Sequence, residues 1–204
     1  MIKAINLKTE YLKNPAVIDI RCPRLFWTVE SALKQTAYQI KGSIDGEEKF
    51  DTGKVKTNTM NSKFQIPLKS RSRVTWKVRL WDESDICGPW SEDAVFEMGL
   101  LSEEDWKAKW IDPEFVHDIE ERQPASYLKR EFYLGELGNA RLYITAHGIY
   151  DAYINGRRVG NFILAPGTSQ YDKRLQYQCC DVSGLLKKGT NEIVVSVGDG
   201  WWRG

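Results

Sequence analysis

Short runs of alternating apolar and polar residues recur along this chain, and they constrain its fold more than any other feature. The clearest run, at residues 74–81, places Val74, Trp76, Val78 and Leu80 at every second position. A period of two predicts a strand with one buried face, and Gly, Asp, Asn and Pro between the runs predict turns. Many short strands separated by turns indicate an all-β chain built from antiparallel β-sandwiches.

The expected strands fall into two groups, which predict two domains in series. The first group comprises residues 5–12, 25–29, 37–44, 64–68, 74–81 and 94–98, and the second comprises residues 127–134, 140–146, 150–154, 157–159, 176–181 and 192–197. Asn155-Gly156 is the strongest hairpin signal, because this pair supplies the two positive φ angles of a type I′ turn. We therefore predict domains at residues 1–97 and 113–204, joined by a linker at 98–112.

The linker is expected to contain a short helix. Ser102 precedes three acidic residues, so it is the expected N-cap, and the acids would favour the positive end of the helix dipole. Trp106 and Trp110 are four residues apart and would share one face of a helical turn, forming a stiff joint between the domains. Residues 112–124 are charged, contain His117 and show no period, which predicts an exposed loop.

Composition excludes several classes of partner. The 29 Lys and Arg residues nearly balance the 28 Asp and Glu residues, so a net charge of +1 predicts no nucleic acid partner. The chain has no apolar run that would serve as a signal peptide or span a membrane, and we expect a cytoplasmic protein without a membrane partner. Cys22, Cys87, Cys179 and Cys180 lack metal-ligand spacing. We expect free thiols, no metal and no cofactor.

The first domain resembles a fibronectin type III domain. The resemblance rests on Pro23-Arg24-Leu25-Phe26-Trp27 in an early strand, Trp76-Lys77-Val78-Arg79 in a late strand and Pro89-Trp90-Ser91 before the last strand. In that family the early Trp lies in the core. We therefore expect Trp27, Trp76 and Trp81 to fill the first core, with Trp90 at an edge.

The whole chain resembles the N-terminal region of bacterial α-L-rhamnosidases, in which a β-sandwich module follows a fibronectin-like module. The matching motifs are Ala146-His147-Gly148-Ile149-Tyr150-Asp151-Ala152-Tyr153-Ile154-Asn155-Gly156, Leu164-Ala165-Pro166-Gly167, Tyr171-Asp172-Lys173-Arg174 and Gly198-Asp199-Gly200-Trp201-Trp202-Arg203-Gly204. Each motif alone is only moderately specific, but their order is highly specific.

The resemblance implies an inverting glycosidase that removes terminal α-L-rhamnose with carboxylic acids in an (α/α)₆ barrel downstream of these modules. Nothing in the chain resembles that barrel, so we assign no catalytic residue and expect the chain to be inactive alone. In the family the second, jelly-roll-like sandwich continues beyond the glycine-rich loop at residues 198–204. We therefore expect this sandwich to be cut short in the present chain.

Two loops carry candidate ligand-binding residues. Asp199, Trp201, Trp202 and Arg203 combine indole rings with charged groups, a combination that holds sugars by stacking and hydrogen bonding. The preferred alternative is that the indoles pack against the rest of the sandwich or the catalytic domain. Tyr171 and Asp172 form the second candidate site, with His147 expected nearby. The preferred alternative for that segment is a solvated loop held by a salt bridge.

Three functions remain open at this stage. The leading hypothesis is a noncatalytic part of an α-L-rhamnosidase that acts as a spacer and docks on or shapes the catalytic domain of the same polypeptide. The first alternative is a carbohydrate-binding module for a rhamnosyl glycan, and the second is an adhesion or scaffolding protein. An incomplete sandwich would also leave an unpaired edge strand, through which we expect self-association.

Overall fold

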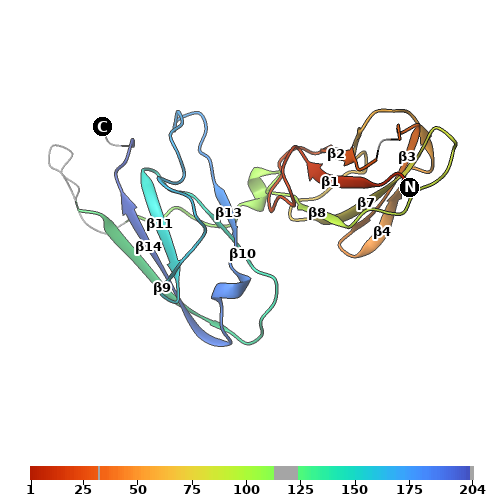
Figure 1. Ribbon diagram of the computed structural model, residues 1–204. Helices are drawn as coiled ribbons and strands as arrows, with labels where there is room; N and C mark the ends of the chain where they lie inside the picture. The colour runs from red at the N-terminus through yellow and green to blue at the C-terminus, as the bar shows by residue number, and fades with distance from the viewer. Residues whose placement is uncertain (32, 113–123, 203–204) are drawn as a thin grey trace. The chain divides into compact units, whose positions relative to one another are not determined.

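The computed structural model describes residues 1–31, 33–112 and 124–202. The chain divides into two compact units, Met1–Ala108 and Lys109–Gly204, which are described separately below (Figure 1). Within the described ranges, no helix has the length and apolar character needed to cross a bilayer. All four cysteines are free, as predicted.

The first unit is an antiparallel sandwich of two sheets. One sheet has the order β1-β2-β6 and the other the order β4-β3-β7-β8, with β5 paired to β3. The strands are β1 (Ala4–Thr9), β2 (Arg24–Val29), β3 (Ala37–Ile44), β4 (Glu47–Asp51), β5 (Val55–Lys56), β6 (Asn61–Lys63), β7 (Arg73–Trp81) and β8 (Ala94–Glu97). Their inward side chains form one core that includes Leu25, Ile40, Trp76 and Phe96. The sandwich architecture predicted for this part of the chain is confirmed.

Two details of the first core differ from the sequence prediction. Trp27 and Trp76 lie in the core, but Trp81 lies on the opposite face of β7 because it is an odd number of residues from Trp76. There Trp81 is covered by cations, with the Arg79 guanidinium 5.1 Å and the Lys54 ammonium 4.9 Å from its ring. Residues 64–68 form no strand; the pairing strand is β6, just before the buried Phe64.

The predicted N-cap in the linker is confirmed, but the prediction that Trp106 and Trp110 share one face of a helix is wrong. Ser102 accepts a hydrogen bond from the Glu104 amide and caps a single 3₁₀ turn at Glu103–Asp105. Trp106 is already extended at the end of that turn, and no helix continues to Trp110. Most of the expected loop at 112–124 lies outside the described residues.

The second unit packs a two-stranded sheet, β10-β13, against a four-stranded sheet with the order β12-β11-β14-β9 (Figure 1). The elements are β9 (Ser126–Leu134), β10 (Arg141–Ile144), β11 (Ile149–Ile154), β12 (Arg157–Arg158), β13 (Gln178–Asp181), the 3₁₀ turn η2 (Ser183–Leu185) and β14 (Gly189–Gly198). Alternate side chains of β11 and β14 face β10 and β13. The core therefore includes Ala152, Ile154 and Cys180.

The Asn155-Gly156 hairpin is confirmed and has a second role. Both residues have positive φ, 50° and 76°, at the turn between β11 and β12. The Asn155 side-chain amide also donates to the Leu185 carbonyl at 2.9 Å and to the Asn191 side-chain oxygen at 2.8 Å. Its own oxygen accepts from the Glu192 backbone amide at 3.0 Å. This network connects the hairpin to the segment that enters β14.

Candidate functional site

The candidate site lies at one end of the second unit, where the chain enters β11 and leaves β14. Ile149 pairs with Gly198, so the residues before β11 and after β14 are neighbours. Gly148 has a φ of +93°, and a Cβ atom there would lie 2.2 Å from the Gly198 carbonyl oxygen. Only glycine fits this close approach. It brings His147 beside the loop that carries Trp202.

Four rings form an aromatic cluster at this end, which we call the aromatic stack: Trp110, His147, Tyr171 and Trp202. The imidazole of His147 stacks on Trp202 at a centroid distance of 4.1 Å and on Trp110 at 4.4 Å, with interplanar angles of 8° and 13°. Two indoles stacked this closely must occupy opposite faces of the imidazole. Tyr171 meets both His147 and Trp202 edge-on, at 6.2 and 5.7 Å.

The aromatic stack is accessible to solvent. Trp110 is 63% exposed and Trp202 is 44% exposed, although each places one ring face on His147. Aromatic rings of this size release considerable free energy when they are removed from water. The outer indole faces and the edge of the stack can therefore contact a sugar ring or another protein surface.

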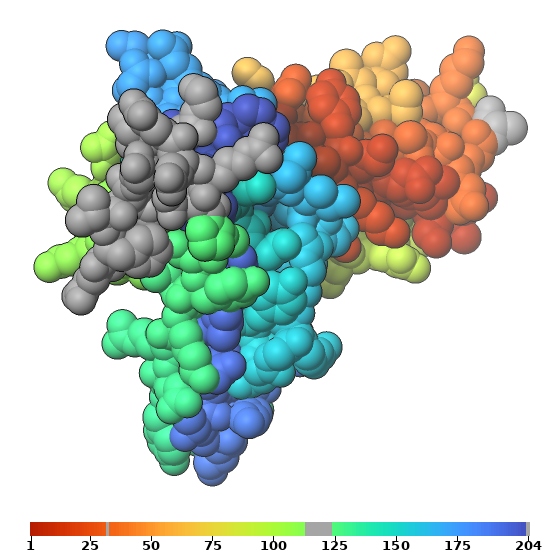
Figure 2. Space-filling view, turned by 90° about the vertical axis from the view of Figure 1, so that its left-hand side faces the viewer, coloured from red at the N-terminus to blue at the C-terminus, as the bar shows by residue number. Residues whose placement is uncertain are grey.

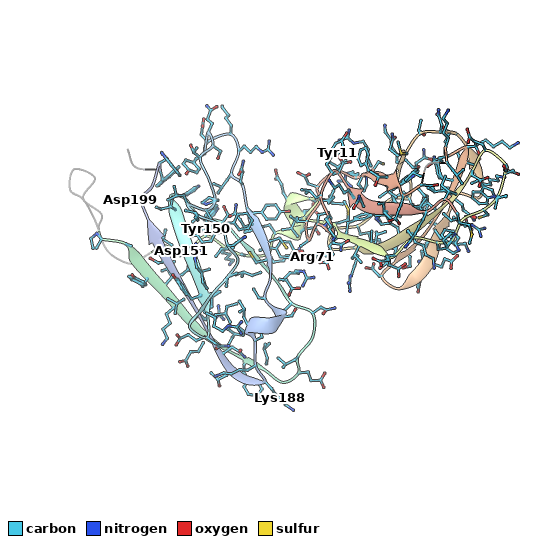
Figure 3. The ribbon with its side chains drawn as sticks, viewed as in Figure 1. Tyr11, Arg71, Tyr150, Asp151, Lys188 and Asp199 are labelled. Carbon is cyan, nitrogen blue, oxygen red and sulfur yellow. The ribbon has the colours of Figure 1, made fainter. Side chains whose placement is uncertain are left out.

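A buried polar network supports the loop that carries Tyr171. The Tyr150 hydroxyl donates to the Gln178 side-chain oxygen at 2.6 Å, and the Gln178 amide donates to the Pro166 carbonyl at 3.1 Å. Burial raises the pKa of the Tyr150 phenol well above its ordinary value, which is itself above neutral pH, so the protonated donor form is favoured further. Tyr171 itself donates to the Gly167 carbonyl at 3.4 Å. Tyr150 on β11 and Asp199 just after β14 are labelled in Figure 3.

The structure brings some of the sequence-predicted site residues together and leaves others apart. Tyr171 and Trp202 meet in the aromatic stack, and His147 lies near Tyr171 as expected. The Asp199 carbonyl accepts the Trp202 amide in a turn, and Trp201 is half exposed. Asp172 is exposed and lies 3.8 Å from the Lys173 ammonium. Arg203 lies outside the described residues.

Trp110 is the site residue that the sequence did not assign. Its apparent helical spacing to Trp106 placed it in a joint, whereas the structure stacks it on His147. No local pattern signals this contact, because the two residues are far apart in the chain.

The geometry does not support a sugar site inside the second unit or a metal site among the described residues. A cavity between the two sheets of the second unit, lined by Ile144, Tyr150 and Cys180 among others, has a volume of about 10 Å³. That is room for one water molecule and too small for a sugar. Among the residues that the structure describes, no group of three or more His, Cys, Asp or Glu side chains is placed to hold a metal ion.

Comparison with known families identifies both units. Residues 4–102 match the family described as the Rha78A-like, N-terminal immunoglobulin domain, and residues 135–204 match the α-L-rhamnosidase N-terminal domain. The chain belongs to the α-L-rhamnosidase family and corresponds to the N-terminal region of its members. The immunoglobulin-type match agrees with the fibronectin-like sandwich expected for the first unit, since both are antiparallel sandwiches.

Known α-L-rhamnosidases resemble the chain along nearly its whole length. The α-L-rhamnosidase of Alteromonas sp. (strain LOR) is 35% identical over 99% of this chain and 24% of its own length. The solved structure from Dictyoglumus thermophilum aligns with a TM-score of 0.85 and 33% identity, covering 97% of this chain and 25% of that one. The solved structure from Aspergillus terreus aligns with a TM-score of 0.89 and 30% identity, covering 99% of this chain and 24% of that one. The chain thus spans about a quarter of the length of these α-L-rhamnosidases.

Proposed function

We propose that this chain is the noncatalytic N-terminal part of an α-L-rhamnosidase, in which it acts as a spacer and docks on the catalytic domain. Two findings support the proposal. Both units match N-terminal domains of this family, and the relatives extend over about three further lengths of this chain. The catalytic acids of such an enzyme would then lie in sequence outside these two units.

The observation that carries the docking role is the exposure of the aromatic stack. Trp110 and Trp202 are large, 63% and 44% exposed, and held rigidly by stacking on His147. Rigid exposed aromatic residues are the side chains that contribute most to protein interfaces, because they bury much apolar area at a small entropic cost. A catalytic domain that covers this end of the second unit would remove these rings from water.

The activity proposed for the parent enzyme is hydrolysis of terminal α-L-rhamnosides with inversion. An inverting glycosidase needs one carboxylic acid to protonate the leaving group and a second carboxylate to activate water. The two carboxyl groups must be roughly 6.5–9.5 Å apart to leave room for that water. We assign neither role to an acidic residue of this chain.

A second function, binding of a rhamnosyl glycan, is favoured by the same exposed indoles. Sugars stack their C–H faces on aromatic rings, and hydrogen-bonding groups nearby fix their orientation. The outer ring faces of Trp110 and Trp202 and the exposed carboxylate of Asp172 would offer this combination. Docking and sugar binding require different partners, so they can be separated by experiment.

Calorimetry would test docking. The chain is titrated with the C-terminal three quarters of the Dictyoglumus thermophilum relative, produced separately. We expect saturable binding that is lost in Trp202→Ala and retained in Tyr11→Ala, a control with a similarly exposed ring in the first unit, 61% accessible. Binding that survives Trp202→Ala would contradict the role of the aromatic stack.

A titration with L-rhamnose, monitored by tryptophan fluorescence, would test the second function. The docking proposal predicts no saturable change, whereas saturable quenching that disappears in Trp202→Ala would favour sugar binding instead. Hydrolysis of p-nitrophenyl α-L-rhamnoside by the 204-residue chain alone would contradict the noncatalytic role.

A further inference from the structure

In the part of the chain that the structure describes, β9 is the outer strand of the four-stranded sheet of the second unit. This strand pairs with β14 along its whole length, from Ser126 to Leu134, and ends the order β12-β11-β14-β9. Within the described ranges, no strand pairs with its other side. Its atoms, green in Figure 2, lie at the surface of that view. An edge strand of this length presents a row of amide and carbonyl groups that can template another strand.

The sequence of β9 is nearly self-complementary when read against itself in the antiparallel direction. With Arg130 on a two-fold axis, Lys129 of one copy lies opposite Glu131 of the other, twice; each Lys129 ammonium also forms an ion pair with Glu192 of its own β14. In the same register Tyr127 lies opposite Tyr133 and Leu128 opposite Phe132, again twice. Opposite charges and aromatic or aliphatic pairs directly across an antiparallel ladder are stabilising.

We propose that β9 pairs antiparallel with β9 of a second copy of this chain, in the register centred on Arg130. The pairing would join two four-stranded sheets into one continuous sheet across a two-fold axis. It gives the unpaired groups of the edge strand hydrogen-bond partners. Tyr127 and Tyr133, 74% and 72% exposed, would cover each other on one face.

Neighbouring registers lose this complementarity. A shift by one residue would move every side chain of the partner strand to the other face of the sheet. Centring the pair on Lys129 or on Glu131 keeps the faces but removes both Lys129–Glu131 pairs, while like charges still meet on the axis, as they do in the register centred on Arg130. The two Lys129–Glu131 pairs therefore favour the register centred on Arg130.

Arg130 works against the same pairing and limits its strength. It is exposed, lies opposite Ile193 of β14, and so projects on the face that packs toward the core. A charge that points inward from an edge strand is a common device against edge-to-edge association. In the proposed dimer the two Arg130 side chains meet on the axis, so Arg130→Thr should tighten the dimer.

Sedimentation velocity of the 204-residue chain over a range of concentrations tests the proposal. We expect a reversible monomer–dimer equilibrium. Glu131→Lys turns two attractive pairs into repulsive ones and should raise the dissociation constant about tenfold. The double variant Lys129→Glu/Glu131→Lys restores both pairs and should restore the wild-type constant. Thermal unfolding of each variant checks that the fold is intact.

The single variant should keep its fold, because the neighbouring strand β14 offers position 131 an acidic residue. Glu131 lies opposite Glu192 of β14, which already pairs with Lys129, so a lysine at position 131 gives Glu192 a second cationic neighbour in place of a like charge. A chain that stays monomeric at high concentration, a Glu131→Lys variant that dimerises as strongly as wild type, or a double variant that does not recover would each overturn the proposal.

Crosslinking tests the register independently. Residues directly opposite each other in an antiparallel pair have Cα separations of about 4.5–5.5 Å, within the range that a disulfide can bridge. In a Cys22→Ser background, which removes the exposed native thiol, Arg130→Cys should form a covalent dimer on mild oxidation. Tyr133→Cys, whose partner in this register is Tyr127, should crosslink far less. Equal crosslinking of the two variants would exclude the register centred on Arg130.

Discussion

The substitution Asn155→Asp separates two roles of one side chain in the second unit. Aspartate keeps the turn, because Asp-Gly adopts a type I′ hairpin about as readily as Asn-Gly. It also keeps the oxygen that accepts the Glu192 amide. It removes the amide donor to Leu185 and Asn191. If the turn alone mattered, this substitution would leave stability nearly unchanged.

The contacts predict a substantial loss instead. Each lost hydrogen bond contributes about 1 kcal/mol net, and the new carboxylate faces two acceptor oxygens that have lost their donor. The Asn191 amide cannot easily rotate to compensate, because its oxygen also accepts from Lys187 at 2.9 Å. We therefore expect a loss of about 2–3 kcal/mol at neutral pH. For a unit of this size the melting temperature should fall by roughly 10–20 °C.

Differential scanning calorimetry would measure the effect, and the first unit supplies a matched control. Asp45-Gly46 is a second hairpin turn with positive φ, 52° and 90°, and the Asp45 carboxylate accepts the Arg73 amide at 2.8 Å. Asp45→Asn keeps that acceptor and should change stability by less than about 0.5 kcal/mol.

Acidification offers an internal check on the same variant. Protonation of the introduced carboxyl group restores one donor, so its proton is bound more tightly in the folded state. The stability deficit relative to wild type should therefore shrink as the pH falls through the ordinary range of aspartate. A melting temperature for Asn155→Asp within 2 °C of wild type, or a deficit independent of pH, would refute the proposed role of the network.

Two further predictions concern the second unit. Gly148→Ala should destabilise it by more than about 2 kcal/mol, because φ is positive at Gly148 and the new methyl group would meet the Gly198 carbonyl. Gly184→Ala is the control, since a methyl group there would enter open space. Thermal unfolding of both variants would show whether the close approach matters. The Ser183 backbone amide lowers the pKa of Asp181, so this carboxylate stabilises the fold above its unfolded pKa and loses that contribution as the pH falls through its folded pKa. The melting temperature of Asp181→Asn should therefore fall less steeply than that of wild type below about pH 4, and parallel curves would contradict this account.

The sequence predicted local elements well where periodicity and turn chemistry act on neighbouring residues. The run at 74–81 is strand β7, and Asn155-Gly156 forms the expected turn with both φ angles positive. The prediction was wrong where the pattern was ambiguous. Phe64 is apolar because it is buried in the core, although the chain beyond β6 has left the sheet. Trp81 ends an alternating run at a position that faces away from the core.

The candidate site was only partly predictable. Composition and the glycine-rich loop drew attention to Trp202, and the loop around Tyr171 was expected to lie near His147. Trp110 could not be assigned, because a spacing of four residues from Trp106 indicates a shared face only if the segment is helical. The 3₁₀ turn ends at Asp105, and that spacing then carries no information.

The amino-acid sequence by itself determined the class of fold, the series of two sandwiches and the family, because these depend on period, turn residues and the order of motifs along the chain. Only the tertiary structure decided which aromatic rings meet. The stack of Trp110, His147 and Trp202 depends on the pairing of β11 with β14 and on the close approach at Gly148. Those contacts join residues far apart in the chain, so their geometry follows from packing and from no local pattern.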